Sequence, residues 1–181
     1  MPSRAASFTV IDPGPIPFGL LPNANDEACR LIAARALDQL IYPEQPAEDF
    51  LARVHAAGGL DAFLLPACFR VVRVALAELG AAVPLEDDFL EPATLERLEA
   101  RYRAGLLVDP PVLWQNPDPE IGWDLIDGTH RLVAAERAGR TEVNIFELQA
   151  PTPESPAQAA AAADDVARVA EQVAEAAAGR S

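Results

Sequence analysis

Residues 123–148 read WDLIDGTHRLVAAERAGRTEVNIFEL, and this stretch decides the fold class. Its residue types predict, in order, a strand over Trp123–Asp127, a helix over Thr129–Ala138 and a strand over Glu142–Leu148. Gly128 permits a sharp turn between the first strand and the helix, and Gly139 suits the C-terminal cap of that helix. The stretch therefore indicates a strand–turn–helix–strand unit.

The residues just upstream extend this unit. Pro111–Trp114 predicts another strand, and the turn-rich run Gln115–Gly122 predicts a hairpin that joins it to Trp123–Asp127. A helix is expected from Pro92 or Thr94 through Tyr102, because its apolar positions share one face. Before that helix, residues 83–85 are expected to form a short edge segment and residues 86–88 an acidic turn.

The N-terminal half is predicted to be mainly helical. An extended run, Ser7–Ile11, and a proline-rich arm ending at Pro17 precede helices expected from an Asn25 or Asp26 cap to Leu40 and over Ala47–Ala57. A third expected helix, Pro66–Leu79, is the most apolar, with Gly80 at its cap and only Arg70 and Arg73 as a polar strip. A helix this apolar should lie in the core or at an interface.

Composition limits the classes of partner. The chain has 28 acidic residues against 14 basic ones, all of them arginine, and a net charge of −14. Such a field repels nucleic acid, so DNA is not expected as a partner and any phosphate must be held locally. No apolar run is long enough to span a membrane and Met1–Val10 lacks a signal-peptide core, so a cytoplasmic protein is expected. Cys29 and Cys68 are expected to be free, buried thiols, and no spacing predicts a metal site.

The five residues Asp127-Gly128-Thr129-His130-Arg131 carry the candidate chemistry. A helix N-terminus favours an anion, and Gly128 would let a phosphate approach the backbone. Thr129 offers a hydroxyl, Arg131 a guanidinium fork and His130 a donor or proton shuttle. The other interpretation of the same residues is structural: Asp127 caps the helix, Gly128 turns the chain, and His130 and Arg131 pair with nearby acids.

The run Asp124–Ala135, DLIDGTHRLVAA, resembles the Asp-Gly-x-His-Arg signature of the ParB/sulfiredoxin-like superfamily. The order of predicted elements from Val83 to Leu148, about a third of the chain, is similar too. The resemblance implies a ParB/sulfiredoxin-like core that binds a nucleoside triphosphate, ATP or CTP, together with Mg²⁺. It places the phosphates at Gly128 and at the start of the following helix.

Members of that superfamily differ in activity, and this sequence departs from two branches. Thr129 stands where a sulfiredoxin has its cysteine, so reduction of an over-oxidised partner cysteine is not expected. The acidic, alanine-rich segment after Ala150 takes the place of the helix-turn-helix of the partitioning proteins, which use CTP as a clamp switch. Relatives that phosphorylate free serine have an acidic residue near the start of the domain, which implies Glu91 as a second candidate base beside Asp127.

The sequence thus predicts an α+β fold with a small mixed sheet. The chain is expected to have three parts: an N-terminal arm and helical extension (1–82), a domain that the resemblance implies to be ParB/sulfiredoxin-like (83–149) and a Pro/Ala-rich acidic tail (150–181). The expected function is nucleotide binding, with NTP hydrolysis or phosphoryl transfer to a small molecule. Asp127, His130 and Glu91 would be catalytic, and Gly128, Thr129, His130 and Arg131 would bind the nucleotide. The alternative is a non-catalytic protein-interaction or regulatory module with a vestigial phosphate site, in which Pro66–Leu79 is the binding face. Trp114 and Trp123 are expected either to stack on a base or to lie in the core.

Overall fold

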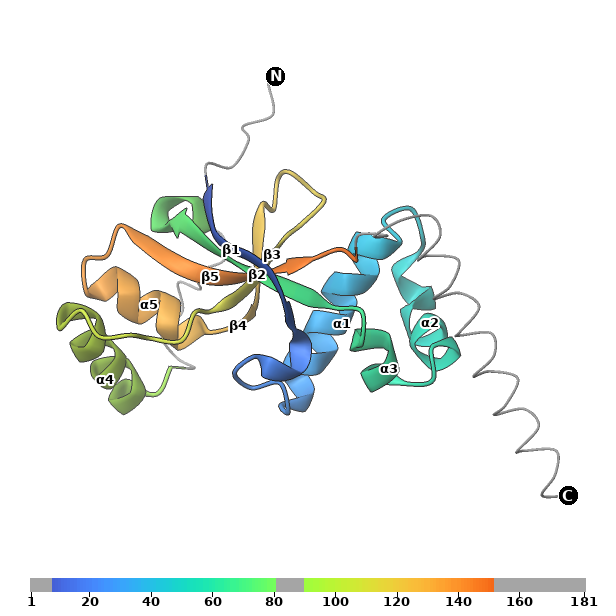
Figure 1. The fold of residues 1–181 in the computed structure, drawn as a ribbon, viewed down its shortest axis with the longest axis horizontal. Helices are drawn as coiled ribbons and strands as arrows, with labels where there is room; N and C mark the ends of the chain where they lie inside the picture. Colours follow the sequence, from blue (N-terminus) through green and yellow to red (C-terminus); the bar gives the residue numbers. More distant parts are fainter. Residues whose placement is uncertain (1–7, 81–89, 152–181) are drawn as a thin grey trace, which may run out of the picture. The chain divides into compact units, whose positions relative to one another are not determined.

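The computed structural model describes residues 8–80 and 90–151, which form a five-stranded mixed sheet flanked by helices (Figure 1). The strands are β1 (Phe8–Pro17), β2 (Cys68–Ala75), β3 (Val112–Gln115), β4 (Trp123–Asp127) and β5 (Glu142–Gln149). Their order across the sheet is β1-β2-β5-β3-β4. The β3/β5 pair is parallel, and the other neighbouring pairs are antiparallel. The predicted α+β class with a mixed sheet is confirmed, including the hairpin of β3 and β4.

Most of the predicted helices are present. The α-helices are α1 (Glu27–Ile41), α2 (Phe50–Ala56), α3 (Leu60–Leu64), α4 (Pro92–Arg103) and α5 (Thr129–Arg137). There are also three short 3₁₀ helices in the described residues, η1 (Phe18–Leu20), η2 (Ala47–Asp49) and η3 (Leu76–Leu79). Of the two residues predicted as the cap of α1, Asn25 and Asp26, the cap is Asp26, whose carboxylate accepts the Cys29 N–H at 2.8 Å and so satisfies a free donor in the first turn.

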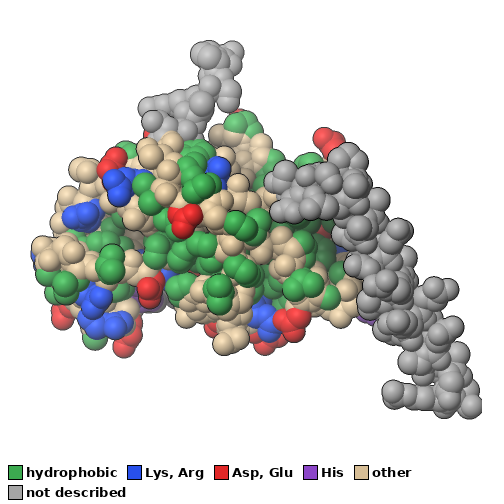
Figure 2. All heavy atoms as spheres, viewed as in Figure 1, with side chains coloured by type: hydrophobic (Ala, Val, Ile, Leu, Met, Phe, Trp, Pro, Cys, Tyr) green, Lys and Arg blue, Asp and Glu red, His purple; other side chains and the backbone are tan. Residues whose placement is uncertain are grey.

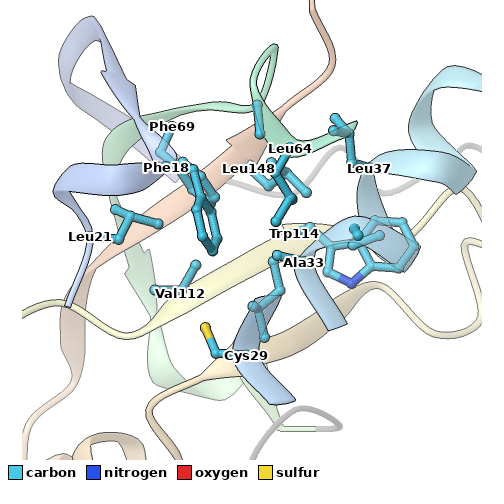
Figure 3. Close-up of a cluster of buried hydrophobic side chains, with 14 of the residues drawn as sticks. Phe18, Leu21, Cys29, Ala33, Leu37, Leu64, Phe69, Val112, Trp114 and Leu148 are labelled. Atoms are coloured by element: carbon cyan, nitrogen blue, oxygen red, sulfur yellow. The ribbon is translucent and has the colours of Figure 1, made fainter. Parts of the chain in front are cut away.

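The two faces of the sheet bury different helices. Successive residues of β3 point to opposite faces, so Val112 and Trp114 belong to one core cluster and Leu113 to another. The first cluster packs α1 and α3 against the sheet through Ala33, Leu37 and Leu64 (Figure 3). The second packs α5 through Leu132 and Ala135, and α4 then covers α5 through a third cluster around Leu95. The sheet is thus the middle layer, with α1 and α5 on opposite sides.

The sheet also curls. Phe8 of β1 and Trp123 of β4 lie in the two edge strands, yet their rings meet edge to face with centroids 5.9 Å apart. On the face seen in Figure 2, arginine side chains are scattered among acidic ones around the margin and form no continuous basic stripe among the described residues. The surface in this view therefore lacks the charge pattern of a nucleic-acid interface.

The helix predicted over Pro66–Leu79 is wrong. These residues form the inner strand β2, hydrogen-bonded to β1 on one side and to β5 on the other, followed by η3. Phe69 packs on the α1 side and Val72 and Val74 on the other side, so both faces of the strand bury apolar side chains and the polar alternation of an ordinary strand is missing. The β-branched valines favour the extended form. An apolar helical binding face at these residues, as the interaction-module alternative required, does not exist.

Residues on both sides of the predicted boundary at 83 share one sheet, because β2 from the N-terminal part pairs over its full length with β5. The described residues up to Ala150 accordingly belong to one compact unit. The N-terminal part is therefore integral to the fold rather than an extension added to it. The edge segment predicted at 83–85 and the acidic turn predicted at 86–88 lie outside the described residues.

Candidate functional site

The predicted strand–turn–helix–strand unit is confirmed, and its turn is tightly built. Strand β4 ends at Asp127, Gly128 takes the left-handed conformation with φ 111°, and α5 begins at Thr129. A Cβ on Gly128 would lie 2.6 Å from the Cβ of Pro111, so the loop that leads into β3 leaves room only for glycine. The structural reason for Gly128 is therefore sufficient by itself, whether or not a ligand binds here.

The N-terminus of α5 keeps unsatisfied donors. The N–H groups of Arg131 and Leu132 both donate to the Gly128 carbonyl, at 3.0 and 3.1 Å. The N–H groups of Thr129 and His130 donate to no group in the described part of the chain. Such free N–H groups, at the positive end of the helix dipole, are the usual backbone element of an anion site.

An open cleft of about 650 Å³ lies over this helix start. Three segments distant in sequence build it: the turn before α1, one face of α4 with the loop that follows it, and the β4–α5 turn. The lining side chains are Pro22, Asn23, Leu90, Thr94, Arg97, Leu98, Arg101, Leu107, Val108, Asp109 and residues 127–131. The cleft is thus partly apolar and partly cationic.

Arg131, predicted to bind the nucleotide, lines the cleft but is held by groups of the protein itself. Its guanidinium donates to the Asp127 carboxylate and, at 2.7 Å, to the carbonyl of Pro110, and its side chain is only 11 % exposed. The fork therefore fastens the helix start to the end of β4 and to the loop before β3. Replacing Arg131 would disturb this brace together with any ligand, so it is a poor probe of binding.

Asp127 is equally engaged. Its Oδ2 atom accepts from Arg131 and also from Asn23 Nδ2, at 2.9 Å, across 104 positions of sequence. Asn23 holds a left-handed backbone conformation, with φ 60°, that brings its amide to the cleft. Oδ1 is the carboxylate oxygen left for a ligand proton, so Asp127 is positioned by two donors whatever its role in chemistry.

The structure brings His130 and Glu91, two of the three predicted catalytic residues, together. The Glu91 N–H donates to His130 Nε2 at 3.0 Å, which fixes Nε2 as the acceptor and leaves the proton on Nδ1. The Glu91 carboxylate accepts the Thr94 hydroxyl at 2.6 Å, at the start of α4. The contact ties the first turn of α4 to the first turn of α5, and proton transfer at Nε2 would require this bond to break.

Sequence reasoning missed the cationic wall of the cleft. Thr94, Arg97 and Arg101 recur at i, i+3 and i+7 on α4 and all line the cavity. The Arg97 side chain makes no hydrogen bond or ion pair with the described residues, whereas the Arg101 guanidinium donates to the Leu107 carbonyl. The spacing was visible in the sequence, but only the packing of α4 beside α5 shows that this face meets the DGTHR turn.

The remaining candidates have core roles. Trp114 and Trp123 are buried in the two sheet clusters and do not line the cleft. Cys29 is buried and Cys68 partly buried, and both are free as predicted. Burial, reinforced by the Asp127 charge, raises the pKa of the Cys29 thiol to about 11. No group of three or more His, Cys, Asp or Glu side chains in residues 8–80 and 90–151 is arranged to hold a metal ion.

Comparisons with known proteins give no information about the site. No protein-family model, no curated protein and no solved structure matches the chain. Within the described ranges, none of the helices has the length and apolar character needed to cross a bilayer. Any function must therefore be inferred from the residues of the cleft themselves.

Proposed function

We propose that the cleft binds a nucleotide, with a phosphate group at the start of α5, and that the chain carries a ParB/sulfiredoxin-like core. The observation that carries this proposal is the alignment of two features on opposite walls. The free N–H groups of Thr129 and His130 supply backbone donors from α5, and the uncommitted guanidinium of Arg97 faces the same cavity from α4. Backbone donors and a fork-shaped cation are the two elements that recognise phosphate oxygens.

The size and lining of the cleft support a nucleotide rather than free phosphate. A volume of about 650 Å³ lies in the range of small-molecule and cofactor sites, roughly 300–1,000 Å³. Its apolar lining residues, Pro22, Leu90, Leu98, Leu107 and Val108, offer contacts for a base and ribose. The ligand is thus expected to have an anionic end and a planar, largely apolar end.

Phosphoryl transfer or hydrolysis is the chemical extension of this proposal. Mg²⁺ would be held mainly by phosphate oxygens and water, since Asp109 and Asp127 are the only carboxylates on the described lining of the cleft. Oδ1 of Asp127 and the Nδ1–H of His130 are the groups with capacity for a proton or a further hydrogen bond. Glu91 lies next to His130, at the edge of the cleft, and would act on a second substrate there.

Calorimetric titration and thermal-shift measurements with ATP, ADP, CTP and GTP, each with and without Mg²⁺, test the proposal. The decisive variant is Arg97→Gln, which removes a charge that pairs with no side chain in residues 8–80 and 90–151. It should weaken binding about tenfold, as expected for loss of one charge-assisted hydrogen bond. Arg35→Gln is the matched control, because Arg35 is an exposed arginine on α1 that does not line the cleft. No saturable binding of any of the four nucleotides at millimolar concentration would refute nucleotide binding here.

A further inference from the structure

Arginine pairing in this acidic protein is uneven. Among the described residues, six arginines have a carboxylate within 4.0 Å: Arg30, Arg53, Arg70, Arg103, Arg131 and Arg137. The other five are Arg35, Arg73, Arg97, Arg101 and Arg140. Acids outnumber arginines two to one in the chain, so unpaired arginines that gather in one place need an explanation.

Four of these five arginines line two neighbouring cavities. Arg97 and Arg101 line the cleft described above. Arg73 and Arg140 line a second cavity of about 320 Å³, whose other lining residues are Tyr102, Gly105, Leu106, Leu107, Val108, Glu142, Val143 and Asn144. Leu107 and Val108 line both cavities, so the loop after α4 is the partition between them.

Hydrogen-bond donors in the second cavity remain available. Arg73 uses only Nε, which donates to Asn144 Oδ1 at 3.2 Å across the β2/β5 pair, and both of its Nη groups are left over. The side chain of Arg140 has no hydrogen bond or ion pair with the described residues. The Tyr102 hydroxyl has no such partner either, and burial raises its pKa, so it stays protonated and able to donate at neutral pH.

One carboxylate lies in the same cavity. Glu142 begins β5 and lines the cavity, yet it makes no ion pair with either arginine. Two guanidinium groups and one carboxylate leave an excess positive charge in a protein whose total charge is −14. Both guanidinium groups and the Tyr102 hydroxyl line the same cavity, and an oxyanion with several acceptor oxygens is the kind of ligand that such donors recognise.

We propose that this second cavity is a binding site for a small oxyanion, a phosphate or a carboxylate, held by Arg73, Arg140 and Tyr102. The site does not depend on nucleotide binding in the first cleft. Glu142 limits its strength and disfavours ligands with several negative charges. Because the partition loop is shared, and Arg101 fastens it through the Leu107 carbonyl, an anion in the second cavity would contact the back of the wall that faces the first cleft.

Titration of the full-length protein with inorganic phosphate and, separately, with acetate tests the site, with the side-chain Nε–H resonances of the arginines followed by NMR. Saturable shifts at Arg73 and Arg140 are expected, and the stronger of the two probes identifies the ligand class. Arg140→Gln and Arg73→Gln should each weaken binding about tenfold, as for one lost charge-assisted contact. Glu142→Gln should instead tighten it several-fold, because it removes the opposing charge.

Arg97→Gln is the matched control, since it removes the same charge from the other side of the partition loop and should leave the affinity at Arg73 and Arg140 unchanged. All four replaced side chains are on exposed residues, and equal melting temperatures confirm that each variant folds. The proposal is overturned if neither probe shifts Arg73 and Arg140 at millimolar concentration. It is also overturned if Glu142→Gln has no effect, or if Arg97→Gln abolishes the shifts, which would assign them to the first cleft. Failure of nucleotide binding would leave this result unaffected.

Discussion

Replacing Gly128 with alanine should destabilise the fold more than a comparable change at the other end of α5. The backbone at Gly128 has φ 111°, where an L-residue costs roughly 1–2 kcal/mol. The added Cβ would also lie 2.6 Å from the Cβ and 2.8 Å from the Cα of Pro111, a clash that overpacked cores relieve at a cost of about 1–3 kcal/mol. The total is about 2–5 kcal/mol, a large part of the stability of a typical domain.

Gly139→Ala is the matched control. Gly139 also has a positive φ, of 73°, but an added Cβ would meet nothing within 4 Å, so only the conformational cost of about 1–2 kcal/mol applies. In a domain of this size each kcal/mol lowers the melting temperature by about 3 °C. We therefore expect a decrease of about 6–15 °C for Gly128→Ala and about 3–6 °C for Gly139→Ala, using the same principle.

Thermal and urea denaturation without any ligand are the appropriate assays, because the cost comes from the fold itself. Equal destabilisation by the two substitutions would refute the reasoning, since it would mean that the contact with Pro111 is not rigid. The result also bears on function. A Gly128 variant that loses nucleotide binding would not by itself show a phosphate contact. Arg97→Gln separates binding from stability, because the Arg97 side chain pairs with none of the described side chains.

Three further outcomes follow from the structure. Arg70→Met should cost roughly 3–5 kcal/mol in urea denaturation, because it leaves Glu147, only 4 % exposed, without its ion-pair partner, and adding Glu147→Leu should recover most of this loss. The free energy of unfolding should fall as the pH rises from about 9 to about 11. The reason is that the Cys29 thiol has its ordinary pKa of 9.0 in the unfolded chain, whereas its pKa in the folded chain is raised to about 11. A Cys29→Ala variant should show a smaller fall over the same interval. Ending the chain after Ala150 should leave the melting temperature nearly unchanged, because three valines are the only large apolar residues beyond that point; a decrease of many degrees would contradict this.

The local pattern of the C-terminal half determined its structure. In Trp123–Leu148 the spacing of the apolar residues, the glycines and the β-branched residues all favour the same elements. The strand, turn, helix and strand form where they were predicted. Equally local rules placed the cap of α1 at Asn25 or Asp26 and the start of α4 at Pro92 or Thr94, and the structure has Asp26 and Pro92. Capping and turn chemistry act between near neighbours, so the sequence shows them directly.

The identity of β2 depended on contacts outside its own segment. Phe69, Val72 and Val74 are apolar on both faces of the strand, and such a run has no period that distinguishes it from a buried helix. Pairing with β1 and with β5, more than 60 positions later in the chain, decides the extended form. Arg70 and Arg73, which resembled the polar strip of a helix, are cross-strand partners of Glu147 and Asn144.

Some features of the candidate site likewise depend on adjacent residues, and others depend on contacts between distant elements. The sequence by itself determined that Gly128 starts a helix whose first N–H groups are free, because that depends on five adjacent residues. Only the tertiary structure decided that the Arg131 fork is occupied by Asp127 and Pro110, and that Asn23 and Arg97 share the cleft. The physical reason is that the partner of a charged side chain is set by which elements pack together, and the packing of α4 on α5 and of the turn before α1 against β4 cannot be read from local spacing.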